Sequence, residues 1–132
     1  MSVLLHVLFF SEVSTIMSEQ KRVVEKYMEG FRATDHEKIL SCLTDDVVWD
    51  MPGFFYHEGI KAFDKEIENP NADGNPEITI TRLIEEGKIV VAEGTVNAKM
   101  KDGGLIDAEF CDVFNFTNGK ISKLTTYIMF RK

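Results

Sequence analysis

Residues 108–116 read AEFCDVFNF, and the pair Asn118-Gly119 follows them. Side chains of a β-strand alternate between its two faces, so Phe110, Asp112 and Phe114 share one face. An Asn-Gly pair is a strong signal for the tight turn of a hairpin. The stretch therefore predicts a long strand, a tight turn and a second antiparallel strand, with one carboxylate on an otherwise aromatic face.

Asp112 is the residue that points toward function. A charged carboxylate is costly to bury unless it is paired, hydrogen-bonded or neutralised by a raised pKa. A carboxyl group in an apolar cavity can also keep its proton near neutral pH, which is one way in which proteins make an acid. Two roles are therefore open for Asp112: an acid/base group in a pocket, or a structural carboxylate paired with a neighbour such as Tyr27 or Lys123.

The C-terminal half of the chain repeats the same strand-turn pattern. Apolar alternation predicts four strands joined by the turn pairs Glu86-Gly87, Asp102-Gly103 and Asn118-Gly119. The expected strands span residues 77–85, 88–101, 104–117 and 120–131. Strands of this length twist and coil strongly, so a curved antiparallel meander is expected.

The N-terminal half reads as helices around one short strand. Apolar residues with helical periodicity predict a helix over 19–33, and shorter helices are expected over 36–43 and 60–67. A short strand is expected over 47–51 and a loop over 54–58. The predicted fold class is therefore α+β: three N-terminal helices packed on a strongly curved, mainly antiparallel sheet, forming a cone with an internal pocket.

Length and charge narrow the function classes. A chain of 132 residues with 44% hydrophobic content predicts a single domain over 17–132, preceded by an apolar extension over 1–16 whose role is uncertain. The apolar run within that extension is too short to span a bilayer. A net charge of −7 disfavours nucleic acid and anionic membranes as partners. Two isolated cysteines favour a cytoplasmic protein.

The candidate ligand-binding residues are those that the expected cone would direct inward, together with His57 near its mouth. Apolar side chains with a few polar groups are the usual lining of a small-molecule site. The set comprises Phe31, Trp49, Met51, His57, Phe63, Phe110, Phe114, Thr126 and Ile128. The sequence has neither metal-ligand spacing nor a nucleotide-binding motif, so no metal and no cofactor are expected.

Four segments carry a resemblance to a known family: VEKYMEGF at 24–31, LTDDVVWDMPG at 43–53, HEG at 57–59, and the strand and turn over 112–121. In order and spacing the chain resembles the cystatin-like α+β cone superfamily of nuclear transport factor 2, ketosteroid isomerase and the SnoaL-like polyketide cyclases. The resemblance covers nearly everything from residue 17 onward. It implies the cone fold and a homodimer formed through the sheet.

The resemblance also assigns roles. Asp112 falls where ketosteroid isomerases place the acid of their oxyanion hole, and Tyr27 falls on the position of its partner tyrosine. The isomerase's general base falls at Met51, which cannot take a proton, whereas SnoaL-like cyclases rely mainly on one pocket aspartate. The resemblance thus implies a small-molecule-binding SnoaL-like protein. An acid/base enzyme of isomerase, cyclase or dehydratase type on a hydrophobic carbonyl compound is one form that it could take, with Asp112 and Tyr27 as the catalytic residues. The alternative is a non-catalytic ligand-binding or dimeric module with a Phe-filled cone.

Overall fold

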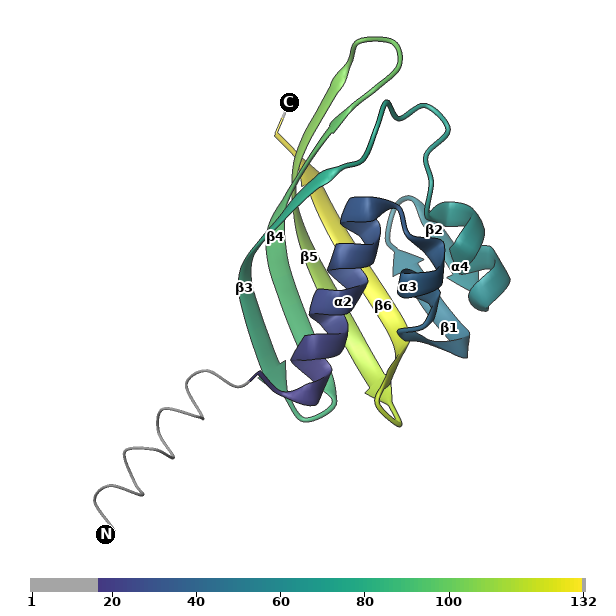
Figure 1. Cartoon of the computed structure of the whole chain (residues 1–132). Coiled ribbons are helices and arrows are strands. Elements are labelled where there is room, and N and C mark those ends of the chain that lie inside the picture. The colour runs from purple at the N-terminus through teal and green to yellow at the C-terminus, as the bar shows by residue number, and fades with distance from the viewer. Residues whose placement is uncertain (1–16, 132) are drawn as a thin grey trace, which may run out of the picture.

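The computed structural model describes residues 17–131, in which helices pack against one curved six-stranded sheet that does not close into a barrel (Figure 1). This confirms the predicted α+β class. The predicted extension over residues 1–16 lies outside the described residues.

The sheet has the strand order β2-β1-β6-β5-β4-β3. All neighbouring strands run antiparallel except β1 and β6, which run parallel. The meander of β3 to β6 agrees with the sequence prediction to within one or two residues at each end. The strands are β1 (Leu43–Met51), β2 (Phe55–Glu58), β3 (Glu77–Glu86), β4 (Ile89–Lys99), β5 (Leu105–Thr117) and β6 (Lys120–Phe130).

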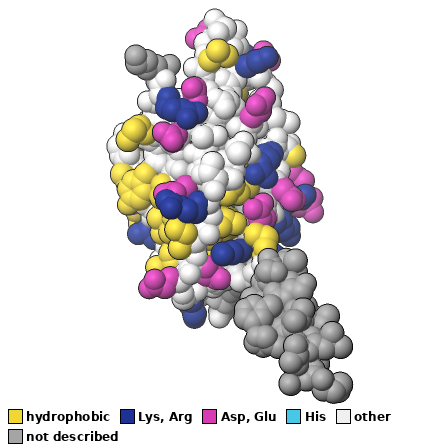
Figure 2. Space-filling view, turned by 90° about the vertical axis from the view of Figure 1, so that its left-hand side faces the viewer, with side chains coloured by type: hydrophobic (Ala, Val, Ile, Leu, Met, Phe, Trp, Pro, Cys, Tyr) yellow, Lys and Arg dark blue, Asp and Glu magenta, His cyan; other side chains and the backbone are white. Residues whose placement is uncertain are grey.

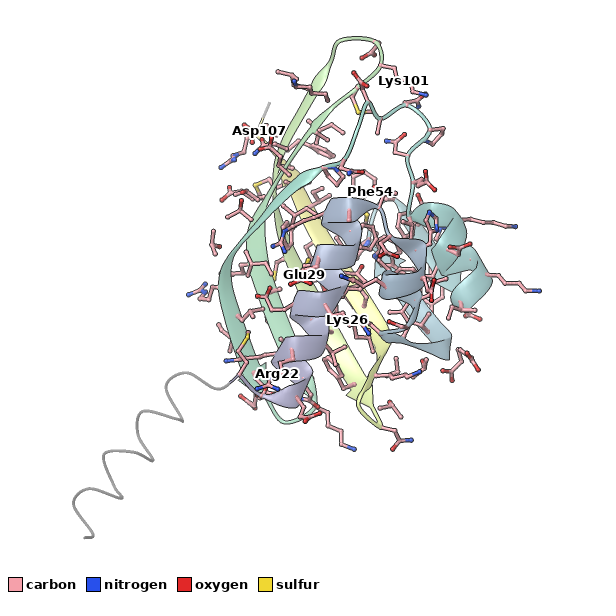
Figure 3. All side chains as sticks on the ribbon, viewed as in Figure 1. Arg22, Lys26, Glu29, Phe54, Lys101 and Asp107 are labelled. Atoms are coloured by element: carbon pink, nitrogen blue, oxygen red, sulfur yellow. The ribbon has the colours of Figure 1, made fainter. Side chains whose placement is uncertain are left out.

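The helices are α2 (Glu19–Ala33), α3 (His36–Leu40) and α4 (Ile60–Glu66). Helix α2 begins after Ser18, whose side chain accepts a hydrogen bond from the backbone N–H of Lys21 at 3.1 Å. It lies across the concave side of the sheet (Figure 1). Its outward face carries charged side chains such as Lys26 and Glu29, which point away from the sheet (Figure 3).

Two local predictions were wrong. The helix expected over 36–43 ends at Leu40, because β1 begins at Leu43, which pairs with Ile121, and not at residue 47 as the sequence predicted. Residues 55–58 were expected in a loop, but they form the edge strand β2, in which His57 lies opposite Trp49. A four-residue strand is stabilised mainly by its neighbour, so its own sequence gives little signal.

The apolar core lies between the helices and the concave face of the sheet. Its largest fully buried side chains include Phe63 and Phe114. At Gly94 the strands β3 and β4 approach so closely that a Cβ atom would lie 2.1 Å from the backbone oxygen of Thr79. The register of β3 shifts beside this contact, between Ile80 and Arg82. Glycine at position 94 therefore permits the irregularity that bends the sheet.

Candidate functional site

A pocket of about 240 Å³, called here the inner pocket, lies between α2 and the concave face of the sheet. Helix α2 and five of the six strands contribute to it. Its lining is almost entirely apolar, and its polar side chains are those of Tyr27, Trp49, Asp112 and Thr126. The full lining comprises Tyr27, Met28, Phe31, Trp49, Met51, Ile78, Val96, Phe110, Asp112, Thr126 and Ile128.

Asp112 enters this pocket from the middle of the sheet. On β5 it lies between Ala92 of β4 and Thr126 of β6, and only 7% of its surface is exposed. Its Oδ1 atom is buried and has no hydrogen-bond partner among the described residues. Burial raises the pKa of Asp112 to about 7, while the Thr126 hydroxyl lowers that pKa in part.

Trp49 and Thr126 are joined by a buried hydrogen bond between their side chains. The indole Nε1–H of Trp49 donates to Thr126 Oγ1 at 3.0 Å. Because an indole N–H can only donate, the Thr126 oxygen accepts here and keeps its own hydrogen for another acceptor. On the neighbouring strand, the Thr126 hydroxyl lies beside the Asp112 carboxyl and lowers its pKa in part.

Tyr27 faces Asp112 from the helix side of the pocket. Its ring lies 5.2 Å from that of Phe114 and 5.0 Å from that of Phe31, measured between centroids. Burial, and then the charge of Asp112, raise the pKa of Tyr27 well above its ordinary value. The phenol therefore stays protonated and remains a hydrogen-bond donor, although the Oδ1 atom of Asp112 accepts no bond from it or from any other described residue.

The inner pocket brings together eight of the eleven residues singled out in the sequence, and the other three lie elsewhere. Phe63 stacks on Trp49 with ring centroids 4.4 Å apart, within the core. Phe114 is fully buried beneath Tyr27. His57 lies on β2, where its Nε2 contacts Glu66 Oε1 of α4 at 2.7 Å.

Three lining residues were missed in the sequence: Met28, Ile78 and Val96. Met28 lies on the apolar face of α2 beside Tyr27, so helical periodicity could have included it. Val96 shares the inward face of β4 with Ala92, as strand alternation requires. Alternation alone cannot tell which inward residues line a pocket and which fill the core.

Metal clusters and membrane-spanning helices are both absent from the described part of the chain. Among residues 17–131, no three His, Cys, Asp or Glu side chains gather in a way that could hold a metal ion. None of the helices in that range is both long and apolar enough to cross a membrane.

Comparison with known proteins places this geometry in a family. The model of the SnoaL-like domain matches residues 24–124 of the chain. The chain belongs to the SnoaL-like domain family. The matched range begins within α2 and ends in β6, so it includes every residue that lines the inner pocket except Thr126 and Ile128. No curated protein matches the sequence.

Several solved structures share this fold. The chain superposes on an LEH-like epoxide hydrolase from M. tuberculosis with a TM-score of 0.74 and 22% identity, covering 84% of this chain and 83% of that one. For a candidate SnoaL-like polyketide cyclase from Shewanella putrefaciens the TM-score is 0.74 at 16% identity, with coverages of 86% and 91%. For a candidate ketosteroid isomerase from Kribbella flavida the values are 0.70 and 18%, with coverages of 84% and 78%. At these identities the likeness concerns the fold.

The chemistry available in the inner pocket follows from its ionisable groups. Among its described lining residues, Asp112 is the one carboxyl group and Tyr27 is the other titratable side chain. A carboxyl with a pKa of about 7 exists in both forms near neutral pH, so it can donate or accept a proton. The Tyr27 phenol, which stays protonated, can donate a hydrogen bond there.

Proposed function

We propose that this protein binds a small hydrophobic carbonyl compound in the inner pocket and that Asp112 acts on it as a general acid/base. The observation that carries the proposal is the buried Asp112 carboxyl in an otherwise apolar pocket. Its Oδ1 has no partner among the described residues, and its pKa is raised to about 7. A group poised near the working pH is effective in proton transfer.

The proposed chemistry uses the two donors that face each other across the pocket. Protonated Asp112 would donate a hydrogen bond to the carbonyl oxygen, and Tyr27 would donate a second one, so that negative charge developing on the oxygen is stabilised. In its ionised form Asp112 would instead take a proton from the carbon next to the carbonyl. Trp49 and Thr126 would hold the carboxyl in place through the hydrogen bond at 3.0 Å between their side chains.

A deuterium-exchange assay with a panel of simple ketones tests the proposal. Cyclic and aromatic ketones are incubated with the protein in D₂O, and NMR follows deuterium entering the position next to the carbonyl. We expect exchange above the uncatalysed rate for the ketones that fit, reduced roughly 10²–10⁴-fold in Asp112→Asn. Asp46→Asn, which changes an exposed carboxyl on β1, is the matched control. Equal exchange by wild type and Asp112→Asn would refute the acid/base role.

The alternative function is ligand binding without catalysis. It is favoured by the small number of ionisable groups around Asp112, because many proton-transfer reactions use a second acid or base. In that case a ketone would raise the melting temperature of both wild type and Asp112→Asn, since binding to the native state raises apparent stability. No deuterium exchange would accompany this stabilisation.

A homodimer formed through the outer face of the sheet is also proposed. That face exposes Tyr127 and Met129 of β6, with 53% and 70% of their surfaces exposed, beside a groove of about 360 Å³. Figure 2 shows hydrophobic side chains gathered in one region of the molecular surface, with acidic and basic ones among them. Sedimentation should show a dimer for the wild type and a monomer for Met129→Lys. A wild-type monomer at high concentration would contradict the proposal.

A further inference from the structure

A second and larger cavity adjoins the inner pocket. This outer cavity has a volume of about 550 Å³. Phe31, Ile78, Val96 and Ile128 line both spaces, so the two lie directly next to each other along α2, β3, β4 and β6. The outer cavity is bounded on its other sides by the loop over 67–76 and by the β4–β5 hairpin, which rise together at one end of the molecule in Figure 1.

The loop and the hairpin are joined by backbone hydrogen bonds. Asp73 donates from its N–H to the oxygen of Lys99 at 2.8 Å, and Lys101 donates to the oxygen of Asn71 at 2.8 Å. Between these bonds, Ala72 pairs with Met100 as an isolated β-bridge. Figure 3 labels Lys101 near the tip of the hairpin. The loop therefore extends the sheet at this end and forms a wall of the outer cavity that is fixed by backbone hydrogen bonds.

The surface of the outer cavity is mostly apolar. The hairpin contributes Ala98, Met100 and Ile106, and the end of β6 contributes Phe130. These side chains offer a lipophilic surface that continues outward from Ile128 of the inner pocket. A ligand group placed there would gain hydrophobic burial.

Several polar groups that line the outer cavity are already engaged with other protein groups. Thr34 Oγ1 donates to Asn75 Oδ1 at 2.6 Å. Glu68 Oε2 contacts His36 Nε2 at 2.5 Å, and the opposite nitrogen of that imidazole contacts Asp64 at 2.6 Å. These groups do not need a charged ligand, and the carboxylate of Glu68 disfavours an anionic one.

The volume of the inner pocket suggests that a ligand would extend beyond it. Pockets for drug-sized ligands usually have volumes of roughly 300–1,000 Å³, and the inner pocket alone, at about 240 Å³, falls below this range. We propose that the outer cavity is a second binding subsite, which takes the uncharged aliphatic or aromatic tail of the same ligand whose carbonyl group reaches Asp112. This inference rests on the proposed function for the identity of the head group, whereas the tail subsite is tested separately.

Linear methyl ketones of increasing length test the subsite. The dissociation constants of 2-butanone, 2-hexanone, 2-octanone and 2-decanone are measured by calorimetry or by competition with a fluorescent ligand. Because each buried methylene contributes about 0.8 kcal/mol, we expect about fourfold tighter binding per methylene, continuing past the length that fills the inner pocket. Replacing the last methyl of 2-decanone by a carboxylate should remove most of this gain, because Glu68 lines the outer cavity and a charged group is costly to bury in a mostly apolar space.

Two variants locate the tail. Ala98→Phe places a phenyl ring in the outer cavity and should bring the affinity for 2-decanone down towards that for a short ketone, while 2-butanone binds as before. Lys99→Phe adds the same side chain at the next, exposed position of β4 and should leave the whole series unchanged. Ile106→Gln keeps the size of a lining residue but makes it polar, so it should weaken long ketones selectively even if Ala98→Phe does not fold.

The outcomes separate this inference from the proposed function. Affinity that levels off after the shortest ketones in the wild type, or a length dependence that persists in both Ala98→Phe and Ile106→Gln, would overturn the tail subsite while deuterium exchange still supports Asp112. Unchanged exchange in Asp112→Asn would overturn the catalytic role. A length dependence that Ala98→Phe abolishes would support the tail subsite in either case.

Discussion

Replacing Asp112 with Asn should stabilise the protein, and the gain should grow with pH. The pKa of Asp112 is raised from an ordinary value of 3.8 to about 7 by burial. Between these values the unfolded chain has lost this proton while the folded protein still holds it, so rising pH favours unfolding by about 1.4 kcal/mol per pH unit. Above about pH 7 both states are ionised and the cost stays constant, at about 4 kcal/mol for a shift of about 3 units. Because Asn cannot ionise, the free energy of unfolding of Asp112→Asn does not decrease in this way as the pH rises.

Urea unfolding of the two proteins over about pH 5.5 to 8.5, followed by the fluorescence of Trp49, measures the effect. All other titrating groups are common to both proteins, so they cancel in the difference between the two unfolding free energies. That difference should rise up to about pH 7 and then level off. Asp46→Asn, at an exposed position, should show no such rise. A difference that does not change with pH would refute the conclusion that Asp112 is buried with a raised pKa.

Three further perturbations test other parts of the structure. Thr126→Val removes the acceptor of the Trp49 indole N–H, and leaving that buried donor unpaired should lower the free energy of unfolding in urea by about 1–3 kcal/mol. The same substitution should raise the pKa of Asp112, measured by carboxyl ¹³C NMR. An unchanged pKa would show that the Thr126 hydroxyl does not reach the carboxyl. Gly94→Ala would place a Cβ atom 2.1 Å from the backbone oxygen of Thr79, whereas the nearest contact of the new Cβ in Gly104→Ala would be the movable side chain of Asp102. The melting temperature should therefore fall further in Gly94→Ala than in Gly104→Ala. Equal decreases in melting temperature would contradict this reasoning. The carboxylates of Asp64 and Glu68 contact the His36 ring and raise its pKa. The stabilisation that this pairing gives should be complete below about pH 6.5 and should disappear as the pH rises through the folded-state pKa. A ¹H NMR titration of His36 should show the raised midpoint, and an ordinary midpoint would refute the pairing.

Much of the fold could be predicted from local patterns. Period-two alternation and the Asp102-Gly103 and Asn118-Gly119 pairs predicted the strands β3 to β6 to within a residue or two. The same alternation put Asp112 on the concave face with Phe110. Helical periodicity put Tyr27 on the buried face of α2. These patterns are strong because each depends on neighbours within a few positions along the chain.

The elements that sequence reasoning missed depend on distant partners. Strand β2 exists because β1 supplies hydrogen-bonding groups along Trp49 and Met51, and the loop before β3 is ordered by the β4–β5 hairpin. Nothing within residues 55–58 or 69–76 indicates those partners. The outer cavity was not predicted for the same reason, since its walls meet only when the loop and the hairpin are brought together.

Local sequence patterns were enough to predict an α+β cone with one acidic side chain on an aromatic strand face. The three-dimensional packing was needed to show that the carboxyl of Asp112 is buried with no partner for Oδ1 among residues 17–131 and that Thr126 accepts a hydrogen bond from Trp49. It also showed that three predicted site residues do not line the inner pocket: Phe63, Phe114 and His57. The physical reason is that a strand's period fixes which way a side chain points, whereas burial, pKa and cavity shape depend on atoms contributed by α2 and five strands at once.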